Sequence, residues 1–310
     1  MSISASMNTP TSQFDEATAT SYLGKTNRGT YVFSGEAKME WAIGEVPNVS
    51  YVMSIITDSV LKVFEDKHQK DTVALNCFFF NKTLAGNLII EIEELKMSRK
   101  GYCIARAVLK QTKGLDRLSN LSSYDPSEWT DKVQTMFTMG NMDSEEGITC
   151  YHKRPVFSDL DKLEPFTYTF MSEFIDSKFE TGSLPVNMDD SGTPEYTQLM
   201  NFKDQRPTDF KSIPYWCDMI LPPPFLLGQD VLGGPVWCPT MQIEVQFKKK
   251  PTGKQIVAHF ITNHVINGRF DIDGQIWETN GDILATTRHQ CLIVPWSRNT
   301  TNVERSRSKI

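Results

Sequence analysis

The stretch VPNVSYVMSIITDSVLKVF, residues 46–64, decides the fold of the first half of the chain. Its apolar side chains recur three and four residues apart, and this spacing predicts a long helix with one buried face. Pro47 suits the first turn of such a helix. Three runs of strand composition follow at 72–81, 87–97 and 101–111. Short polar turns join these runs, so they predict an antiparallel meander.

Further segments flank this helix and meander. Residues 29–41 have strand composition, and residues 133–140 return as another strand after a polar loop at 112–132. Residues 141–166 and 181–210 are polar and irregular, which predicts long surface excursions.

The second half of the chain repeats this order of elements. A helical stretch at 213–227, interrupted by three consecutive prolines, follows a run of strand character at 166–179. Strand-like runs then follow at 238–248, 254–265, 268–278 and 283–294.

Identical residues recur 167 positions apart, which supports a duplicated unit. The pairs are Phe80 and Phe247, Lys82 and Lys249, Gly86 and Gly253, and Gly101 and Gly268. Each glycine falls at an expected turn between strands, where a positive φ is often needed. We therefore expect an α+β fold in which two similar units each wrap an antiparallel sheet around a helix.

Composition and charge argue against several classes of protein. The 310 residues carry a net charge of -6, which disfavours nucleic acid as a partner because that needs clustered Lys and Arg. No apolar run approaches the ~20 residues that span a bilayer, and residues 1–20 do not resemble a secretory signal. The six cysteines are spread singly, which is typical of reduced thiols in an intracellular protein. His259 and His264 have no metal-site spacing.

Three motifs in the second half resemble those of a known family. They are WCDMILPPP at 216–224, VWCPT at 236–240 and QIWETNGDILATTRHQ at 275–290. In order and spacing they resemble the acyl-CoA thioesterase II-like superfamily, whose members have a double hotdog fold. The first half matches more loosely, through Trp41, Gly44, Pro47-Asn48, Tyr51 and the strand end at 78–80.

The resemblance implies a site with one residue from each motif. In the family an Asp on the second-half helix, a Ser or Thr that opens the next strand and a Gln on the last strand form it. Asp218, Thr240 and Gln290 match these positions. Such a set can orient and deprotonate a water, although each residue also has an ordinary structural interpretation. Positions 167 earlier hold Tyr51 and Val73, so we expect one site, in the second half.

We expect side chains near both helices to line an acyl channel. The predicted substrate-binding residues are Trp41, Asn48, Tyr51, Trp216, Met219 and Trp237. Aromatic residues at such positions are also typical of a hydrophobic core. Family members often have two glycines after Pro-Asn, whereas this chain has Val49-Ser50. That difference affects the shape of the acyl pocket and the contact to an oxyanion.

The resemblance implies an acyl-CoA thioesterase-like hydrolase, with coenzyme A as part of the substrate and no other cofactor or metal. One alternative is a double-hotdog tailoring enzyme of a biosynthetic pathway, such as a dehydratase, isomerase or cyclase. The altered Val49-Ser50 and the polar insertions motivate it. A second alternative is an acyl-binding module without turnover.

The motifs and the strand pattern divide the chain into four parts. They are a flexible N-terminal segment (1–24), an N-terminal hotdog (25–145), a C-terminal hotdog with the site (146–297) and a polar tail (298–310). The last residues, Ser308-Lys309-Ile310, differ from a peroxisomal Ser-Lys-Leu address only in a conservative last position. This predicts a peroxisomal import receptor as a partner, or otherwise a cytoplasmic location. Edge-to-edge association of hotdog sheets is compatible with a homodimer.

Overall fold

The computed structural model describes residues 12–150, 160–180 and 192–301. The elements of the first half are α1 (Gln13–Thr18), β1 (Ser21–Lys25), β2 (Tyr31–Ala37), η1 (Met39–Trp41), β3 (Ala42–Ile43), β4 (Val46–Pro47), α2 (Val49–Phe64), β5 (Asp71–Phe79), β6 (Gly86–Lys96), β7 (Cys103–Gln111), η2 (Leu121–Ser123), η3 (Pro126–Glu128) and β8 (Thr130–Gly140), where η marks a 3-10 helix. Those of the second half are η4 (Leu160–Lys162), β9 (Leu163–Phe166), β10 (Ile175–Glu180), β11 (Glu195–Phe202), α3 (Ile213–Asp218), η5 (Pro223–Leu227), α4 (Gln229–Leu232), β12 (Val236–Trp237), β13 (Thr240–Phe247), β14 (Ile256–Ile261), β15 (Val265–Ile266), β16 (Arg269–Glu278), β17 (Ile283–Leu292), β18 (Val294–Pro295) and η6 (Trp296–Arg298).

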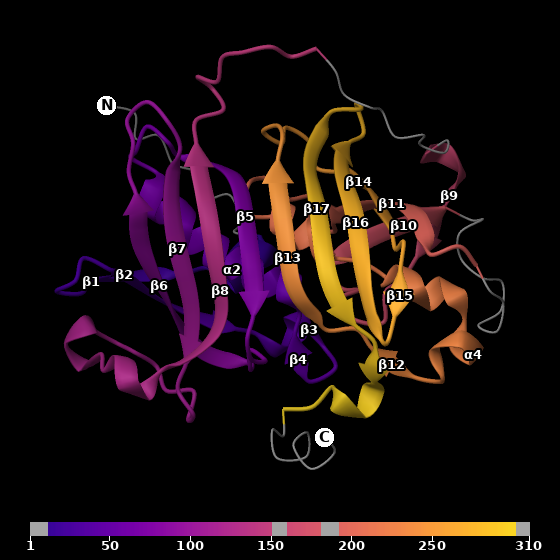
Figure 1. Ribbon diagram of the computed structural model, residues 1–310, viewed down its shortest axis with the longest axis horizontal. Helices are drawn as coiled ribbons and strands as arrows, with labels where there is room; N and C mark the ends of the chain where they lie inside the picture. Colours follow the sequence, from indigo (N-terminus) through magenta and orange to yellow (C-terminus); the bar gives the residue numbers. More distant parts are fainter. Residues whose placement is uncertain (1–11, 151–159, 181–191, 302–310) are drawn as a thin grey trace, which may run out of the picture.

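One antiparallel sheet of 14 strands runs through both halves (Figure 1). Its order is β1-β2-β6-β7-β8-β5-β13-β17-β16-β14-β11-β10-β9, with β15 paired to β16. The run β6-β7-β8-β5 of the first half has its counterpart in β14-β16-β17-β13 of the second half. This confirms the predicted duplication. At the centre β5 pairs with β13, from Phe78 opposite Gln242 to Ala74 opposite Gln246, so the halves share one continuous sheet.

Helix α2 is buried on more than the one face that the sequence predicts. Of its 16 residues, 12 are buried, including Ser54 and Thr57. The reason is that α2 packs against the sheet and also against α1 and α3. The buried hydroxyls of Ser54 and Thr57 donate to the carbonyl oxygens of Ser50 and Met53, one turn earlier. These bonds satisfy polar groups that would otherwise be costly in the core.

Helix α3 takes the place of α2 in the second half but has only 6 residues. The sequence predicts a helical stretch over 213–227 interrupted at the three prolines, whereas α3 already ends four residues before the first of them and η5 follows as a 3-10 helix. Tyr215, Trp216 and Cys217 are fully buried against the rest of the core. Asp218 is the last residue of α3, and the chain after it turns away from the helix axis. The end of α3 therefore places a carboxylate beside the irregular segment that follows.

Several segments differ from the sequence predictions, and two of them contribute to the core. Residues 12–24, expected to be flexible, contain α1 and β1, and Phe14 of α1 is only 1% exposed because it packs on Trp41 and Tyr215. Residues 195–202, expected to lie in a surface excursion, form the buried strand β11. This strand is polar in sequence, but Thr197 and Gln198 are buried with it and are hydrogen-bonded.

A cluster of charged side chains joins the two halves on the side of the sheet where α1 and α2 lie. Arg206 contributes two nitrogens to Asp15, at 3.0 and 2.8 Å, and also pairs with Asp209. Lys211 lies 2.6 Å from Asp15 and 3.5 Å from Asp58 of α2. Partial burial opposes ionisation of Asp15, but the hydrogen bonds from Arg206 and Lys211 outweigh it and hold the pKa of that carboxyl well below its usual range.

We expect Arg206→Met to lower the free energy of unfolding by about 2–3 kcal/mol, because Asp15 and Asp209 lose the buried guanidinium that pairs with both, and only Lys211 stays beside Asp15. Arg106→Met, which breaks an exposed pair with Glu93, should cost less than about 1 kcal/mol. Urea unfolding of both variants measures the difference. The effect of Arg206→Met should be full above about pH 4, the ordinary pKa of Asp, and decrease at lower pH as Asp15 takes up a proton. Equal costs for the two variants would contradict this account.

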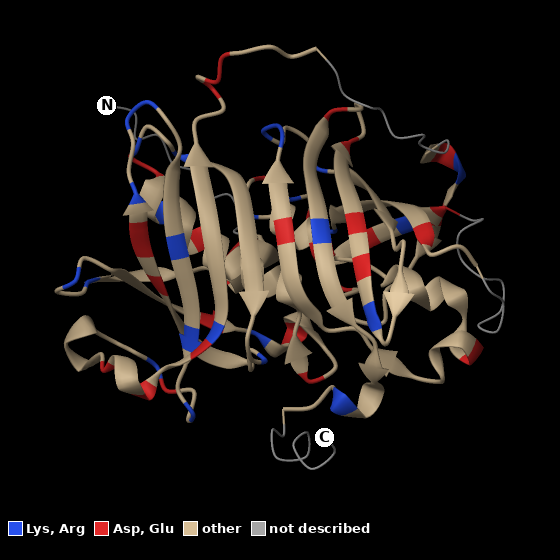
Figure 2. Ribbon diagram, in the orientation of Figure 1, with Lys and Arg blue, Asp and Glu red and all other residues tan. Residues whose placement is uncertain are grey.

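The outer face of the sheet carries charges of both signs. Arg288 of β17 lies opposite Glu244 of β13 and Asp273 of β16, and its Nε is 3.4 Å from the Asp273 carboxylate. Figure 2 shows this mixture of acidic and basic residues across the strands of the second half. In the part of the chain that the structure describes, no helix combines the length and apolar character needed to cross a membrane.

Candidate active site

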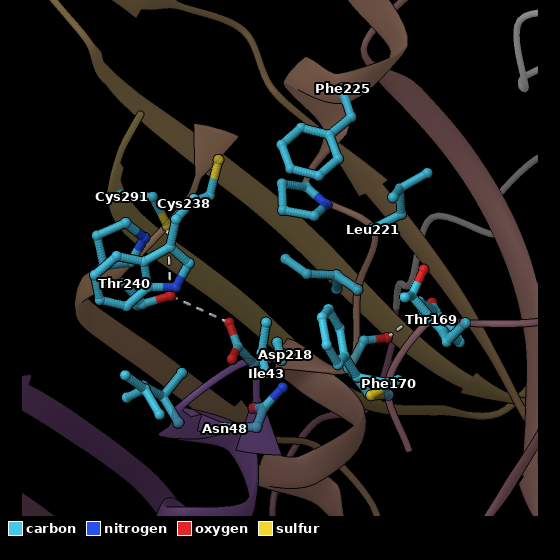
Figure 3. A pocket seen from close by; sticks show the side chains of 18 of the residues that line it. Ile43, Asn48, Thr169, Phe170, Asp218, Leu221, Phe225, Cys238, Thr240 and Cys291 are labelled. Carbon is cyan, nitrogen blue, oxygen red and sulfur yellow. Dashed lines mark hydrogen bonds between the residues drawn. The ribbon is translucent and has the colours of Figure 1, made fainter. Parts of the chain in front are cut away.

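A pocket of about 200 Å³ lies where the start of α2 meets the segment after α3. Its lining is predominantly apolar, and both halves of the chain contribute to it. The lining residues include Ile43, Val46, Asn48 and Val49 of the first half and Phe166, Tyr168, Phe170, Asp218, Met219, Leu221, Phe225, Trp237, Cys238, Thr240, Cys291 and Trp296 of the second. Figure 3 shows most of these side chains around one hollow.

Asp218 and Thr240 come together at one end of this pocket. Asp218 is 6% exposed, and Thr240, the first residue of β13, is 8% exposed. The Thr240 hydroxyl donates to Asp218 Oδ1 at 3.4 Å, and the sulfur of Cys291 lies 3.6 Å from that hydroxyl (Figure 3). Two of the three residues that the resemblance implies therefore meet in a pocket.

Gln290, the third residue, does not join them. It is exposed on β17, and it lines a separate shallow hollow with Met241 and Arg269 on the outer side. Side chains alternate between the two faces of a strand. His289 and Cys291 point inward, so Gln290 between them points outward. The expected convergence of Asp218, Thr240 and Gln290 around one water is therefore not met.

His289 lies next to Asp218 instead. Its imidazole is fully buried, and its Nδ1 is 3.2 Å from Asp218 Oδ1. His289 is not among the residues that line the pocket, so it touches Asp218 from behind. The sequence carries a signal for this arrangement: Arg288 is a charged residue that faces solvent, and Gln290, two residues further along a regular strand, lies on the same outer face. In the regular register, His289 shares the inner face with Cys291.

Asn48 brings a polar group of the first half to the same pocket. It is the N-cap of α2, and its Oδ1 accepts hydrogen bonds from the Ser50 backbone N–H at 2.7 Å and from the Ser50 hydroxyl at 2.6 Å. These bonds use the oxygen of the amide and leave its nitrogen as a donor. Figure 3 shows Asn48 and Asp218 at the same end of the pocket.

Of the other predicted substrate-binding residues, Met219 and Trp237 line the pocket, whereas Trp41, Tyr51 and Trp216 do not. These last three are at most 1% exposed and belong to the core. Trp41 stacks on Phe174 at 4.2 Å between ring centres, and the Tyr51 hydroxyl donates to the backbone oxygen of Ala17. They lie in the core because Trp41 of η1 and Tyr51 of α2 pack on each other and against α3. Sequence reasoning missed Ile43, Tyr168 and Phe170 as lining residues.

The pocket thiols are not suited to act as nucleophiles. Burial raises the pKa of Cys238 to about 12 and that of Cys291 well above its usual value. Both thiols therefore stay protonated near neutral pH, and a thiol in that form is a poor nucleophile. Among the described residues, no group of three His, Cys, Asp or Glu side chains could hold a metal ion.

We expect iodoacetamide at pH 8 to modify Cys150 first, because that thiol is exposed. Cys238 should react far more slowly, since its thiolate is scarce at that pH. Peptide mass spectrometry after a short reaction measures both, and the urea-unfolded chain should take up six labels. Rapid labelling of Cys238 in the folded protein would argue for an activated thiol in the pocket.

Comparisons with known proteins agree with this fold. Residues 153–293 match the acyl-CoA thioesterase C-terminal domain family. Among solved structures, a candidate thioesterase II from Thermobifida fusca YX has 16% identity and a TM-score of 0.74, covering 92% of this chain and 99% of that one. An acyl-CoA thioesterase II from Mycobacterium marinum has 11% identity and a TM-score of 0.66, covering 92% and 99%.

A third structure, a conserved protein of unknown function with a hot dog fold from Alicyclobacillus acidocaldarius, has 17% identity and a TM-score of 0.73, covering 92% of this chain and 98% of that one. No curated protein matches the sequence of the chain. The predicted double hotdog is thus confirmed. The protein shares the fold of these thioesterase structures, and its residues 153–293 match the acyl-CoA thioesterase C-terminal domain family.

Proposed function

We propose that this protein hydrolyses acyl thioesters, with acyl-CoA as the substrate class, in the pocket that contains Asp218. The observation that carries the proposal is a nearly buried carboxylate, oriented by Thr240, at one end of an apolar pocket. The apolar lining suits an acyl chain, and the carboxylate suits a general base that acts on water. The match of residues 153–293 to an acyl-CoA thioesterase domain supports the same reaction class.

The reaction follows from the two oxygens of Asp218. Thr240 engages Oδ1, so Oδ2 takes a proton from a water in the pocket. The water oxygen then forms a bond to the thioester carbonyl carbon, and the carbonyl π electrons move to its oxygen. When this intermediate collapses, the carbon–sulfur bond breaks and the departing thiolate takes the proton from Asp218. The products are a carboxylic acid and free coenzyme A, with no covalent enzyme intermediate.

The start of α2 supplies donors for the oxyanion in this scheme. Asn48 and Val49 both line the pocket, so the Asn48 amide nitrogen and the first backbone N–H groups of α2 are the donors available there, and the positive end of a 16-residue helix favours negative charge. Val49-Ser50 in place of two glycines does not remove these donors, because a valine or serine has the same backbone N–H as a glycine. The Val49 side chain instead narrows the acyl pocket, which it lines.

The position of His289 favours hydrolysis over the tailoring reactions. A dehydratase needs an acid and a base that both reach the acyl group, whereas the His289 ring is closed off behind Asp218 and does not line the pocket. The exposed Gln290 likewise does not reach the pocket. Asp218 is thus left as the acid–base group of the pocket itself, which suffices for attack by water.

A thiol-release assay with a series of acyl-CoA substrates of increasing chain length tests the proposal. We expect saturable release of free thiol, with kcat/KM rising from acetyl-CoA to longer chains as apolar surface is buried. Binding of acyl-CoA without thiol release would instead indicate an acyl-binding module. Peroxisomal import remains a prediction, since Ser308-Lys309-Ile310 lies outside the described residues, and a homodimer remains one too.

A further inference from the structure

The His289 imidazole is a buried polar group that the hydrolysis scheme above does not use. It is 0% exposed, and neither of its ring nitrogens makes a hydrogen bond of good geometry to a described residue. A buried polar group without a good partner destabilises the fold, so its presence needs an explanation. The contact that the ring does make is the 3.2 Å approach of Nδ1 to Asp218 Oδ1.

The ring lies in an apolar layer between strands. Its neighbours across β13 and β16 are Ile243 and Ile272, and both are fully buried. Within the described part of the chain, Asp218 is the one carboxylate within 4 Å of the ring. The imidazole and the carboxylate therefore meet away from water, where their interaction is stronger than on the surface.

The other titratable groups around Asp218 stay neutral near pH 7. Burial raises the pKa of Cys77 on β5 to about 12 and raises the pKa values of Cys217 on α3, Cys291 on β17 and Tyr196 on β11 well above their ordinary values. Asp218 and His289 are thus left as the two groups of this cluster whose side chains meet, with Nδ1 of the ring 3.2 Å from Oδ1 of the carboxylate.

We propose that His289 is a positioning residue that shares a proton with Asp218 and keeps its carboxylate ionised and fixed. An ionised carboxylate in an apolar pocket is costly without a donor or a positive charge beside it. The Nδ1–H of His289 supplies that partner at Oδ1. Together with the Thr240 hydroxyl it holds Oδ1 from two directions, which leaves Oδ2 toward the water. The catalytic consequence of this inference rests on the proposed function, whereas the shared proton itself does not depend on that function.

Nuclear magnetic resonance of ring nitrogens tests the shared proton without any turnover. The full chain, labelled with ¹⁵N in its five histidines, is titrated with pH as wild type and as Asp218→Asn, and the His289 signals are assigned from a His289→Gln sample. We expect the His289 ring to take up its proton at lower pH in Asp218→Asn, because the carboxylate that stabilises the charged ring is gone. An unchanged titration would overturn the proposal, whether or not the protein is a hydrolase.

Kinetics of His289→Gln test the positioning role. We expect kcat for thiol release to fall about 10- to 100-fold with KM within about threefold, since the base is misplaced while the acyl pocket is intact. The acid limb of the kcat/KM profile should move to higher pH, because the ionised form of Asp218 has lost the N–H donor proposed to stabilise it. A wild-type rate with an unmoved profile would overturn the role.

His259→Gln is the matched control for these kinetics. His259 also lies 3.2 Å from a carboxylate, that of Glu195, but on the outer face of the sheet and away from the pocket. It should keep the wild-type rate and profile. An equal loss in both variants would attribute the effect to the sheet in general and would overturn the specific role of His289.

Discussion

The Asp218→Asn variant is expected to release thiol from acyl-CoA at least ~100-fold more slowly than the wild-type chain, the scale of losing a general base. Asparagine has the shape of aspartate and can accept the hydrogen bond from Thr240, so the pocket should remain intact. It cannot take a proton from water at neutral pH. The loss should therefore fall on kcat, with KM nearly unchanged.

Steady-state kinetics on the same acyl-CoA, together with the melting temperature, separate this loss from unfolding. Asp273→Asn is a suitable control, because Asp273 is on the outer face of β16 and pairs with Arg288 there. It should retain full activity. If Asp218→Asn turned over at the wild-type rate, Asp218 would not be the base and the proposed reaction would lose its support.

The Asn48→Asp variant is expected to lower kcat by about 10²–10³-fold, the range seen when one oxyanion donor is removed. An aspartate keeps the oxygen that caps α2 through Ser50, but it has no amide nitrogen to donate and it adds negative charge where the oxyanion forms. Stability should change little, because Asp caps a helix as well as Asn does. Kinetics and thermal melting together measure the two effects.

Asn48→Ser separates the lost donor from the added charge. Serine also caps a helix well, so it should preserve α2 while removing the amide nitrogen. We expect a loss of kcat that is smaller than that of Asn48→Asp but in the same direction. Unchanged kcat in both variants would show that the oxyanion does not lie near Asn48, and the donors at the start of α2 would have to be abandoned.

The architecture could be predicted from the sequence because the two halves of the chain have the same order of helix-like and strand-like segments. The recurrence of residues 167 positions apart, such as Phe80 and Phe247, coincides with the ends of β5 and β13 in the structure. The apolar residues that recur three and four positions apart over 46–64 likewise predict α2. Strand β11 was missed because its buried residues include Thr197 and Gln198, whose burial depends on hydrogen bonds that a sequence does not display.

The site could be predicted in part. Asp218 and Thr240 are 22 residues apart in sequence and meet in space, as their motif spacing implies. The inward-facing residue of β17 was misassigned, because a shift of one residue along a strand exchanges its two faces. Gln290 therefore faces out and His289 faces in. Composition also does not distinguish an aromatic residue of the core, such as Trp41, from one that lines a pocket.

The most direct measurement of the central claim is the fate of the acyl group in water labelled with ¹⁸O. The wild-type chain is incubated with a long-chain acyl-CoA, and the products are analysed by mass spectrometry. Attack by a water that Asp218 activates predicts equal amounts of free coenzyme A and of an acid that carries one ¹⁸O atom. An acyl group that is altered while still attached to coenzyme A, or one that is bound and never released, would contradict the account.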